Sequence, residues 1–384
     1  MNINPLNPAH WKILSTSALF LSLAVLRRYT KRASRKNPRV VFYSAVERPT
    51  VTRLVEQLVA RDTADWDIVH CSFEDRAVKE VKRYSSRVRW VNPCTWAGAK
   101  DIVSADVIVT SDRLRTLGIV MHGTRIPFVD VWHGISFKHI KRPGFLRHYR
   151  EVWVSSSYIA ELYQRKLKVP QERLKITGFS PSDPLYEATR EPQKEGSPPR
   201  VLIAPTWSPQ KLWKRGDTED HFWEDYSFLS SLANELNVHF IMRSHFLDRG
   251  ETGDAGSIPC LSFVPQTLVS DPSSLLAEAD VLVTDWSSLA FEFLPTTRPT
   301  LFIENNQNRP EKFLVTPDER WGPVVSSHAD FRNSLIATLD RGQGGKTDDH
   351  DDEVSALNRF HRPFEGQPSA VIQADRLRKM LSRH

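Results

Sequence analysis

Short apolar runs alternate with amphipathic stretches along most of the chain. Runs such as residues 40–43, 105–110 and 279–284 are dominated by apolar residues, which is typical of strands buried on both faces. Between such runs, stretches such as residues 52–61 and 222–236 place apolar residues at helical spacing. Strands that alternate with helices predict an α/β fold with mostly parallel, doubly wound sheets.

The alternation is interrupted once, by a polar stretch rich in Pro and Gly at residues 187–199. A chain of 384 residues usually holds more than one hydrophobic core, so this stretch is predicted to link two domains. Neither a Gly-x-Gly-x-x-Gly turn nor a Walker loop occurs, so no dinucleotide or P-loop nucleotide site is indicated. The predicted division is a membrane-associated segment at 1–38, a first Rossmann-like domain at 39–186, the linker at 187–199, a second Rossmann-like domain at 200–345 and closing helices at 346–384.

The positive charge is concentrated at the N-terminus. The net charge is +6, yet the first 46 residues contain eight Lys or Arg and no Asp or Glu, and outside them acidic residues slightly outnumber basic ones. A globally basic nucleic-acid-binding protein is therefore disfavoured. The eight basic residues are Lys12, Arg27, Arg28, Lys31, Arg32, Arg35, Lys36 and Arg39.

An apolar stretch from Trp11 to Leu26 precedes most of these basic residues. As a helix it would reach about 24 Å, short of the ~30 Å hydrocarbon core of a bilayer. The basic cluster follows the apolar run, which disfavours a cleaved signal peptide. We expect residues 11–39 to bind a membrane surface, as a short signal anchor or as a helix in the interface, and we expect the protein on the cytoplasmic face of the inner membrane. The alternative is a helix that packs on the protein itself.

The stretch from Ala279 to Phe293 has the pattern of a strand, a polar turn and the start of a helix. The first backbone N–H groups of a helix lack intrahelical partners and favour anions. Ser287 and Ser288 can cap this helix and can also donate hydrogen bonds to phosphate. Glu292 follows one turn later, where its carboxylate could accept hydrogen bonds from a sugar diol. The alternative is that the serines only cap the helix and Glu292 is solvated.

Polar groups also follow two other strands of the second predicted domain. Thr206 follows the strand at 200–205, and Arg243 with His245 follows the strand at 238–242. Ligands of open α/β sheets bind outside the carboxyl ends of the strands. Arginine suits phosphate oxygens, and a histidine can assist a diphosphate leaving group. Together with the turn at 284–288, these residues predict a phosphate-ligand site at three neighbouring strand ends, although each His or Arg taken singly would more often be structural.

One strand end of the first predicted domain carries comparable chemistry. His133 follows the strand at 128–132 directly, and Gly134 permits a sharp turn or a close approach to a ligand. An imidazole at this position can act as a general base on a hydroxyl, and Lys138 would add positive charge near a phosphate. The alternative for a lone histidine is a structural role.

No metal site is indicated by the sequence. Cys71, Cys94 and Cys260 are far apart and lack metal-ligand spacing, and a disulfide framework is not expected. The acidic run at 348–353 is expected to be a solvated loop.

These motifs, in this order, resemble the CDP-glycerol glycerophosphotransferase family, which comprises teichoic-acid and capsule polymerases and primases. The resemblance covers roughly residues 105–375 and implies a GT-B fold, with two Rossmann-like domains and an active site in the cleft between them. It also implies a metal-independent reaction without a cofactor, in which a CDP-polyol is the donor. The motifs are Trp132-His133-Gly134 with Lys138, Ala204-Pro205-Thr206-Trp207, Arg243-x-His245, Ser274-Leu275-Leu276, the stretch from Thr284 to Phe293, and Gly366-x-x-Ser369.

The resemblance assigns roles to individual positions. His133 matches the proposed catalytic base, and His245 matches the histidine proposed to assist departure of CMP. Glu292 matches the acidic residue of a Phe-Asp-Phe pattern. The positions that match diphosphate-binding groups, with the two turn residues that flank them, are Thr206, Arg243, Thr284, Asp285, Ser287 and Ser288.

The sequence departs from the family pattern at three places. The arginine of the family's Gly-x-Pro-Arg-Asn-Asp is missing from residues 178–183. Ser208 replaces an arginine that usually follows Ala-Pro-Thr-Trp, and Phe246 replaces a proline after Arg-x-His. These changes concern the choice of donor and acceptor more than the class of chemistry.

The expected function is transfer of a polyol phosphate from CDP-glycerol or CDP-ribitol to a hydroxyl of a lipid-linked or polymeric glycan, with release of CMP. Two alternatives remain at this point. One is a GT-B glycosyltransferase that uses a nucleotide sugar. The other is a non-catalytic GT-B-like membrane scaffold, which the missing arginines would permit.

Overall fold

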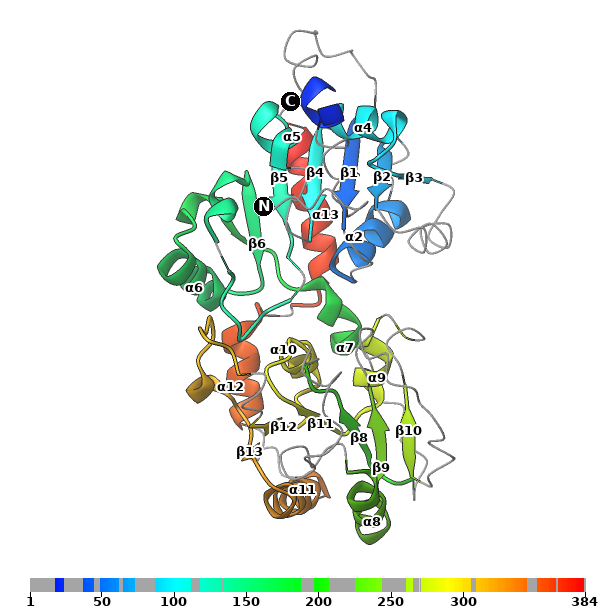
Figure 1. Ribbon diagram of the computed structural model, residues 1–384, viewed down its shortest axis with the longest axis vertical. Coiled ribbons are helices and arrows are strands. Elements are labelled where there is room, and N and C mark those ends of the chain that lie inside the picture. The colour runs from blue at the N-terminus through cyan, green and yellow to red at the C-terminus, as the bar shows by residue number, and fades with distance from the viewer. Residues whose placement is uncertain are drawn as a thin grey trace, which may run out of the picture. The chain divides into compact units, whose positions relative to one another are not determined.

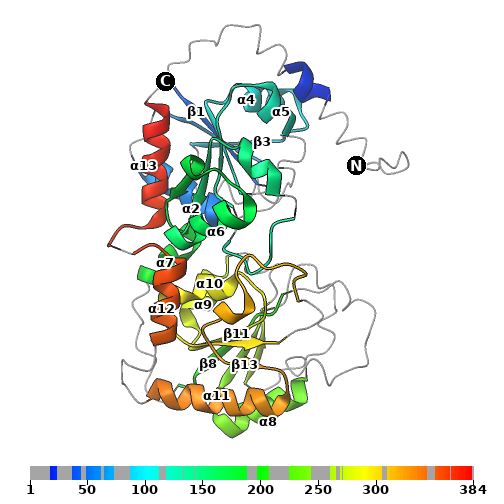
Figure 2. The same ribbon diagram turned by 90° about the vertical axis from the view of Figure 1, so that its left-hand side faces the viewer.

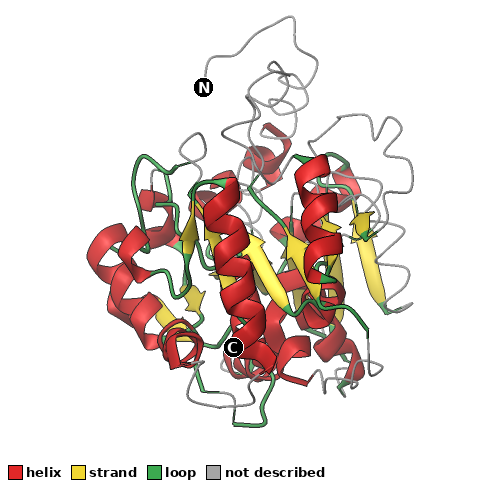
Figure 3. Ribbon diagram, turned by 90° about the horizontal axis from the view of Figure 1, so that it is seen from below, coloured by secondary structure: helices red, strands yellow, loops and turns green. Residues whose placement is uncertain are grey.

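The computed structural model divides the chain into two compact units, each assembled from separate stretches of sequence (Figure 1). The first unit comprises 1–133, 142–180 and 364–384, and the second comprises 134–141 and 181–363. Helices and strands alternate along most of both, as predicted. Figure 3 distinguishes the helices from the strands by colour. The residues that the structure describes are 18–23, 37–44, 49–61, 65–72, 87–111, 118–132, 134–141, 143–187, 197–206, 225–243, 260–264, 269, 271–304, 309–343, 351–363 and 365–382.

The first unit is built on a seven-stranded sheet with the order β3-β2-β1-β4-β5-β6-β7. Every neighbouring pair is parallel, so the amino ends of all seven strands lie along one edge and the carboxyl ends along the other. The strands are β1 (Arg39–Tyr43), β2 (Asp67–Cys71), β3 (Val88–Val91), β4 (Val107–Thr110), β5 (Phe128–Asp130), β6 (Glu151–Val154) and β7 (Leu174–Ile176).

Helices cover this sheet, and the last helix of the chain is one of them. On α13, Ala374 and Leu377 are fully buried in a core with Val40 and Leu54. The predicted closing segment at 346–384 is therefore divided, because the apolar stripe of α13 packs against α2 of the first unit while α12 belongs to the second. The helices of the first unit are α2 (Pro49–Ala60), α4 (Trp96–Val103), α5 (Gly118–Gly123), α6 (Ser157–Leu167) and α13 (Ser369–Leu381), with 3-10 turns η1 (Pro143–His148) and η2 (Gln171–Arg173).

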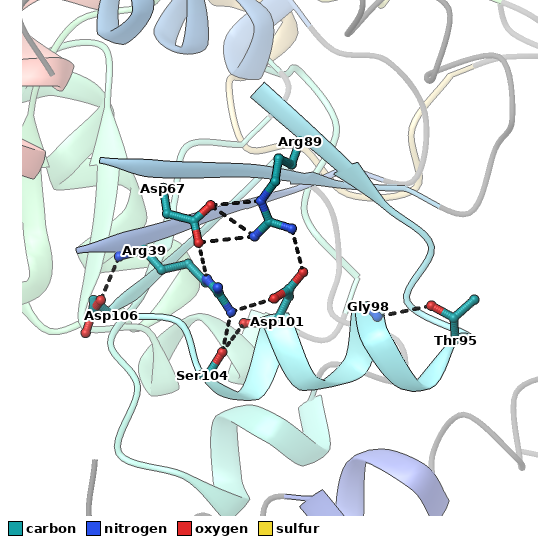
Figure 4. A network of polar contacts seen from close by, with 8 residues as sticks. All are labelled: Arg39, Asp67, Arg89, Thr95, Gly98, Asp101, Ser104 and Asp106. Atoms are coloured by element: carbon teal, nitrogen blue, oxygen red, sulfur yellow. Dashed lines mark hydrogen bonds and ion pairs between the residues drawn. The ribbon is translucent and has the colours of Figure 1, made fainter. Parts of the chain in front are cut away.

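A network of charges fixes the start of β1 (Figure 4). The Arg39 guanidinium lies 2.6 Å from Asp67 through Nε and 2.6 Å from Asp101 through Nη1. Arg89 contacts the same two carboxylates at 3.0 Å. The backbone N–H of Arg39 donates to Asp106 at 2.6 Å. Arg39 is the last of the eight N-terminal basic residues. Its charge is paired within the fold, where it holds the start of β1 beside β2 and α4.

The second unit contains a six-stranded sheet with the order β10-β9-β8-β11-β12-β13. All described pairs are parallel, which confirms the predicted sheet type. The strands are β8 (Arg200–Ile203), β9 (His239–Met242), β10 (Leu261–Phe263), β11 (Val281–Thr284), β12 (Thr300–Ile303) and β13 (Val324–Val325).

Two apolar clusters cover the two faces of this sheet. One includes Leu229 of α8 and Leu335 of α11, and the other includes Leu276 of α9 and Phe293 of α10. Figure 2 shows α9 and α10 on one side of the strands and α8 and α11 on the other. The elements are α7 (Asp183–Glu187), α8 (Tyr226–Leu236), α9 (Ser273–Glu278), α10 (Leu289–Phe293), α11 (His328–Gln343) and α12 (Asp351–Phe360), with 3-10 turns η3 (Ser180–Ser182), η6 (Leu294–Thr296) and η8 (Pro317–Glu319).

Residues 134–141 lie in the second unit, although the predicted boundary placed them in the first domain. Phe137 is fully buried, and its ring lies among four aromatic rings of the second unit, with centroids 4.6–6.3 Å away. The backbone joins as well, because His139 N donates to Lys312 O at 2.9 Å and Leu314 N donates to Phe137 O at 2.8 Å. The four rings are those of Trp286, Phe291, Phe302 and Trp321.

Of the predicted N-terminal membrane segment, the structure describes a helical turn at 18–23. Phe20 and Leu23 are buried there, whereas Leu21 is 55% exposed. No helix in the described part of the chain is long and apolar enough to cross a bilayer. The remainder of the predicted segment up to residue 36, and residues 188–196 of the predicted linker, lie outside the described residues.

Candidate anion site at the strand ends of the second unit

Three adjacent strands of the second sheet end in the predicted polar groups. Strands β9, β8 and β11 are neighbours in that order, and they are parallel. Arg243 directly follows β9, Thr206 lies three residues after β8, and the turn at 284–288 begins in the last residue of β11. The prediction that these groups occupy neighbouring strand ends is confirmed. They converge on one edge of the sheet, where open α/β sheets bind ligands.

Asp285 braces the turn from within. Its side chain is fully buried, and Oδ1 accepts hydrogen bonds from Thr206 N at 2.7 Å and from Thr206 Oγ1 at 2.5 Å. Thr284 is also fully buried and donates from Oγ1 to Ala204 O at 2.7 Å. Both side chains thus join β11 to the segment after β8. Their hydrogen bonds are directed into the protein and hold Thr206 and the turn in place.

The two serines of the turn have different partners. Ser287 Oγ accepts from Leu289 N at 3.3 Å, which is a capping contact at the start of α10. Ser288 Oγ instead donates to Glu292 Oε1 at 3.3 Å. Glu292 is 8% exposed, so the alternative of a solvated carboxylate is wrong. Its backbone carbonyl also accepts from Ser182 Oγ at 3.3 Å, which ties α10 to the segment that enters the second unit.

Arg243 provides the cationic group of the site. Its Nη2 donates to Val269 O at 3.2 Å. Its Nε is buried and, within the described residues, has no hydrogen-bond partner. Burial lowers the pKa of Arg243, and the nearby carboxylates of Glu292 and Asp271 act in the opposite direction. A partly buried guanidinium with an unused N–H group at a strand end is suited to bind an oxyanion.

Gly134 approaches the turn at van der Waals distance. A β-carbon on Gly134 would lie 3.0 Å from Ser288 Cβ and 4.0 Å from Glu292 Oε1, and the backbone has φ +148°. Only glycine adopts this conformation readily. On the other side of His133, Trp132 also has a positive φ, +46°. The chain is therefore held in an unusual conformation on both sides of residue 133, a feature that clusters at functional sites.

Lys138 lies on the same inserted segment. Its backbone pairs with Phe313 in an antiparallel bridge. Burial lowers the pKa of the Lys138 ammonium, and the Asp285 carboxylate opposes this effect.

The second unit brings together most of the predicted site residues, namely Thr206, Arg243, Thr284, Asp285, Ser287, Ser288, Glu292, Gly134 and Lys138. The two predicted histidines, His133 and His245, lie outside the described residues.

Two residues that support the site have no local sequence signal. The Arg320 guanidinium lies over the Trp286 ring at 4.7 Å from its centroid and donates to Glu304 Oε2 at 2.9 Å. His361 is buried, and its Nε2 donates to Phe291 O at 2.8 Å. These contacts join residues that are far apart in sequence, so periodicity could not reveal them.

Within the described residues, no group of three or more His, Cys, Asp or Glu side chains has the arrangement of a metal site.

Comparison with protein families gives one match over most of the chain. The model of the CDP-Glycerol:Poly(glycerophosphate) glycerophosphotransferase family matches residues 26–365. A search of curated proteins finds no significant match.

Several solved structures share the fold. The wall teichoic acid polymerase TagF, in a variant soaked with CDPG, superposes with a TM-score of 0.72 at 16% identity, covering 97% of this chain and 95% of that chain. A UDP-GlcNAc 2-epimerase from Neisseria meningitidis bound to UDP-GlcNAc gives a TM-score of 0.55 at 12% identity, covering 91% and 100%. A glycosyltransferase from Rickettsia africae ESF-5 gives 0.54 at 11% identity, also covering 91% and 100%. At these identities the likeness concerns the fold.

Proposed function

The chain belongs to the CDP-glycerol:poly(glycerophosphate) glycerophosphotransferase family, and from this premise we propose that it transfers a polyol phosphate from a CDP-activated donor to a glycan hydroxyl. As a member of this family the protein is a transferase. The proposed donor is CDP-glycerol, with CDP-ribitol as the related choice. The proposed acceptor is a lipid-linked or polymeric cell-surface glycan of the teichoic-acid or capsule type. No metal or further cofactor is proposed.

The observation that carries the proposal is the position of Arg243. Its buried Nε, which has no partner among the described residues, lies at the end of β9, beside the strand ends that carry Thr206 and the serine turn. Ser287 supplies a hydroxyl donor, whereas the hydroxyls of Thr206 and Ser288 already donate to Asp285 and Glu292. The backbone N–H groups at the start of α10 add to this donor. These donors and the guanidinium match the needs of a diphosphate, which carries its negative charge on several oxygens.

The proposed reaction is an in-line displacement at the β-phosphate of the donor. His133 removes the proton from an acceptor hydroxyl, and the resulting oxygen attacks the β-phosphorus. The bond between this phosphorus and the bridging oxygen breaks, and CMP leaves with that oxygen. Arg243 and the serines stabilise the charge that develops on the leaving phosphate, and His245 donates a hydrogen bond or a proton to it. Lys138 adds positive charge near the transferred phosphate.

We propose a GT-B arrangement, in which the second unit binds the donor and the first unit binds the acceptor. In this arrangement His133 follows a strand of the first unit, while Gly134 begins the segment that packs into the second. We further propose that residues 11–39 bind the membrane and that the enzyme works on the cytoplasmic face of the inner membrane. A lipid-linked acceptor would explain such a location.

A panel of activated donors tests the proposal. The full chain is incubated separately with CDP-glycerol, CDP-ribitol, UDP-glucose and UDP-N-acetylglucosamine together with a membrane fraction that supplies acceptors, and the released nucleotide is identified. Polyol-phosphate transfer releases a nucleoside monophosphate, because the bond between the two phosphates breaks. Glycosyl transfer from a UDP-sugar releases UDP, because both phosphates stay on the nucleotide. CMP from a CDP-polyol alone supports the proposal, and UDP release would refute it.

A further inference from the structure

Arg320 and Trp321 are consecutive residues that contact two segments of the second unit on which the proposed reaction depends. The Arg320 guanidinium lies over the ring of Trp286, the central residue of the serine turn. The Trp321 ring is stacked on Phe137 of the inserted segment at 134–141, with centroids 6.3 Å apart and planes 21° apart. These two residues therefore join the serine turn to the inserted segment.

Hydrogen bonds fix the orientation of the Arg320 guanidinium. The side chain is 9% exposed, its Nε donates to Pro317 O at 3.0 Å, and its Nη2 donates to Glu304 Oε2 at 2.9 Å. Glu304 directly follows β12, the strand paired with β11. A planar guanidinium held at two of its nitrogens can lie flat on an aromatic face, and here its central carbon is 4.7 Å from the Trp286 ring centroid.

The backbone that carries Arg320 is anchored on both sides. On the N-terminal side, Thr316 N and Thr316 Oγ1 each donate to Glu319 Oε2 at 2.7 Å in a capping box. On the C-terminal side, a β-carbon on Gly322 would lie 1.9 Å from Thr300 O, so the chain packs directly on β12. Arg320 thus extends from a firmly held segment, and the position of its guanidinium is set by the sheet.

The serine turn is held from two sides. Asp285 accepts two hydrogen bonds from Thr206 on one side. On the other side the Trp286 ring, which is 1% exposed, meets the guanidinium and the ring of Phe313, whose centroid is 5.2 Å away. Trp286 directly precedes Ser287, so a displaced indole would move the serine hydroxyl and the backbone N–H groups at the start of α10.

We propose that Arg320 is a positioning residue for the transfer reaction and acts through Trp286. Together with Trp321 it sets the spacing between the serine turn, which is proposed to hold the donor diphosphate, and the inserted segment, which follows the proposed base. This inference rests on the proposed function. It assigns Arg320 no contact with the donor, so its loss should misalign the reacting groups and leave the diphosphate-binding groups in the protein.

The test compares steady-state CMP release by the full-length parent chain and by Arg320→Met, with CDP-glycerol as donor and a membrane fraction as source of acceptors. Methionine retains an unbranched side chain but has neither the charge nor the donors. Because a misplacement of about 1 Å can lower a rate by about 10²-fold, kcat should fall by at least about tenfold. The KM for the donor should stay within about threefold. A rise in KM at unchanged kcat would overturn the positioning role.

Arg309→Met is the matched control. Arg309 pairs with the same Glu304 at 2.9 Å and lies 5.9 Å from the Trp286 ring centroid, but its side chain is 48% exposed. Exposed ion pairs contribute little, so kcat and KM of this variant should stay within about twofold of the parent values. An equal loss of kcat in Arg309→Met and Arg320→Met would overturn the specific role of Arg320.

A second variant, Arg320→Lys, covers the case in which thermal unfolding shows that Arg320→Met has lost its fold. Lysine keeps the charge, but its ammonium cannot lie flat on the indole and reach both Pro317 and Glu304, so kcat should still fall by at least about fivefold. Unchanged kcat in Arg320→Lys would overturn the inference while the parent chain still releases CMP. No CMP release by the parent chain would instead refute the proposed function, and the inference with it.

Discussion

Gly134 packs against Ser288 so closely that a β-carbon on Gly134 would lie 3.0 Å from the β-carbon of Ser288. The two residues are far apart in sequence, and they bring the segment after His133 onto the proposed diphosphate turn. Because the neighbouring Phe137 is buried among aromatic rings of the second unit, the segment cannot easily move away from the turn. The contact thus fixes the backbone directly after position 133 against the proposed donor turn.

Replacing this glycine should impair the reaction. Gly134→Ala introduces a methyl group at the Ser288 contact and a residue that tolerates φ +148° poorly, so the backbone next to His133 must shift. Because a misplacement of about 1 Å can lower a rate by about 10²-fold, we expect a loss of this order in kcat for CMP release. Gly144→Ala is the matched control, since a β-carbon there meets no atom within 4 Å. Equal activity of the two variants would show that the close approach has no functional role.

The pH dependence of the reaction should respond to Asp285. Burial lowers the pKa of Lys138 and the Asp285 carboxylate raises it, so Asp285→Asn lowers it further. If the Lys138 charge assists the reaction, the loss of activity at alkaline pH must begin at a lower pH in this variant. The measurement is kcat/KM for the CDP-polyol between neutral and alkaline pH. Thr206→Ala is the control, because it removes a hydrogen-bond partner of Asp285 without changing the charge. The alkaline fall of kcat/KM should occur at the same pH in this variant as in the parent chain. An equal shift of that fall in both variants would contradict the influence of the Asp285 charge on Lys138.

Stability in mild acid should depend on His361. Burial lowers the pKa of His361 to about 4, although its hydrogen bond to Phe291 O acts in the opposite direction. An unfolded histidine has a pKa near ~6.5, so the unfolded state binds the proton first as the pH falls. The buried neutral His361 therefore adds roughly 3 kcal/mol to the free energy of unfolding above pH ~6.5. This stabilisation is lost as the pH falls from ~6.5 to about 4.

Chemical denaturation at several pH values checks this. His361→Asn keeps an N–H donor but cannot titrate, so its free energy of unfolding should fall less steeply than that of the parent chain between pH ~6.5 and ~4. His122→Asn, at an exposed imidazole, should follow the parent curve. Parallel curves for the parent chain and His361→Asn would contradict the burial of a neutral imidazole beside α10.

The sequence predicted the sheets and the strand-end site because both depend on local patterns. Continuous apolar runs marked the strands, and polar groups directly after three of them marked the edge where a ligand binds. The order of β9, β8 and β11 is that of a doubly wound sheet, in which the chain returns from β10 past β9 and β8 and places β11 beside β8. Thr206, Arg243 and the turn at 284–288 could therefore be grouped from the pattern of residues alone.

What the sequence did not predict depends on tertiary partners. Phe137 is one apolar residue in a polar segment, and only the aromatic rings from the second half of the chain explain why residues 134–141 leave the first unit. Arg39 was grouped with the membrane-facing cations, yet Asp67 and Asp101 pair with it. Glu292 had the pattern of a solvated or ligand-facing carboxylate, and Ser288 with Arg243 accounts for its burial.

The most direct test of the account is CMP release by the parent chain and by His133→Ala, with CDP-glycerol as donor and a membrane fraction as source of acceptors. General-base assistance is typically worth about 10²–10⁴-fold, so the variant should release CMP at least about 10²-fold more slowly. Donor affinity, measured by calorimetry on the same preparations, should stay within about twofold, because Arg243 and the serine turn remain intact. Equal rates for the two proteins, or no CMP release by the parent chain, would contradict the account.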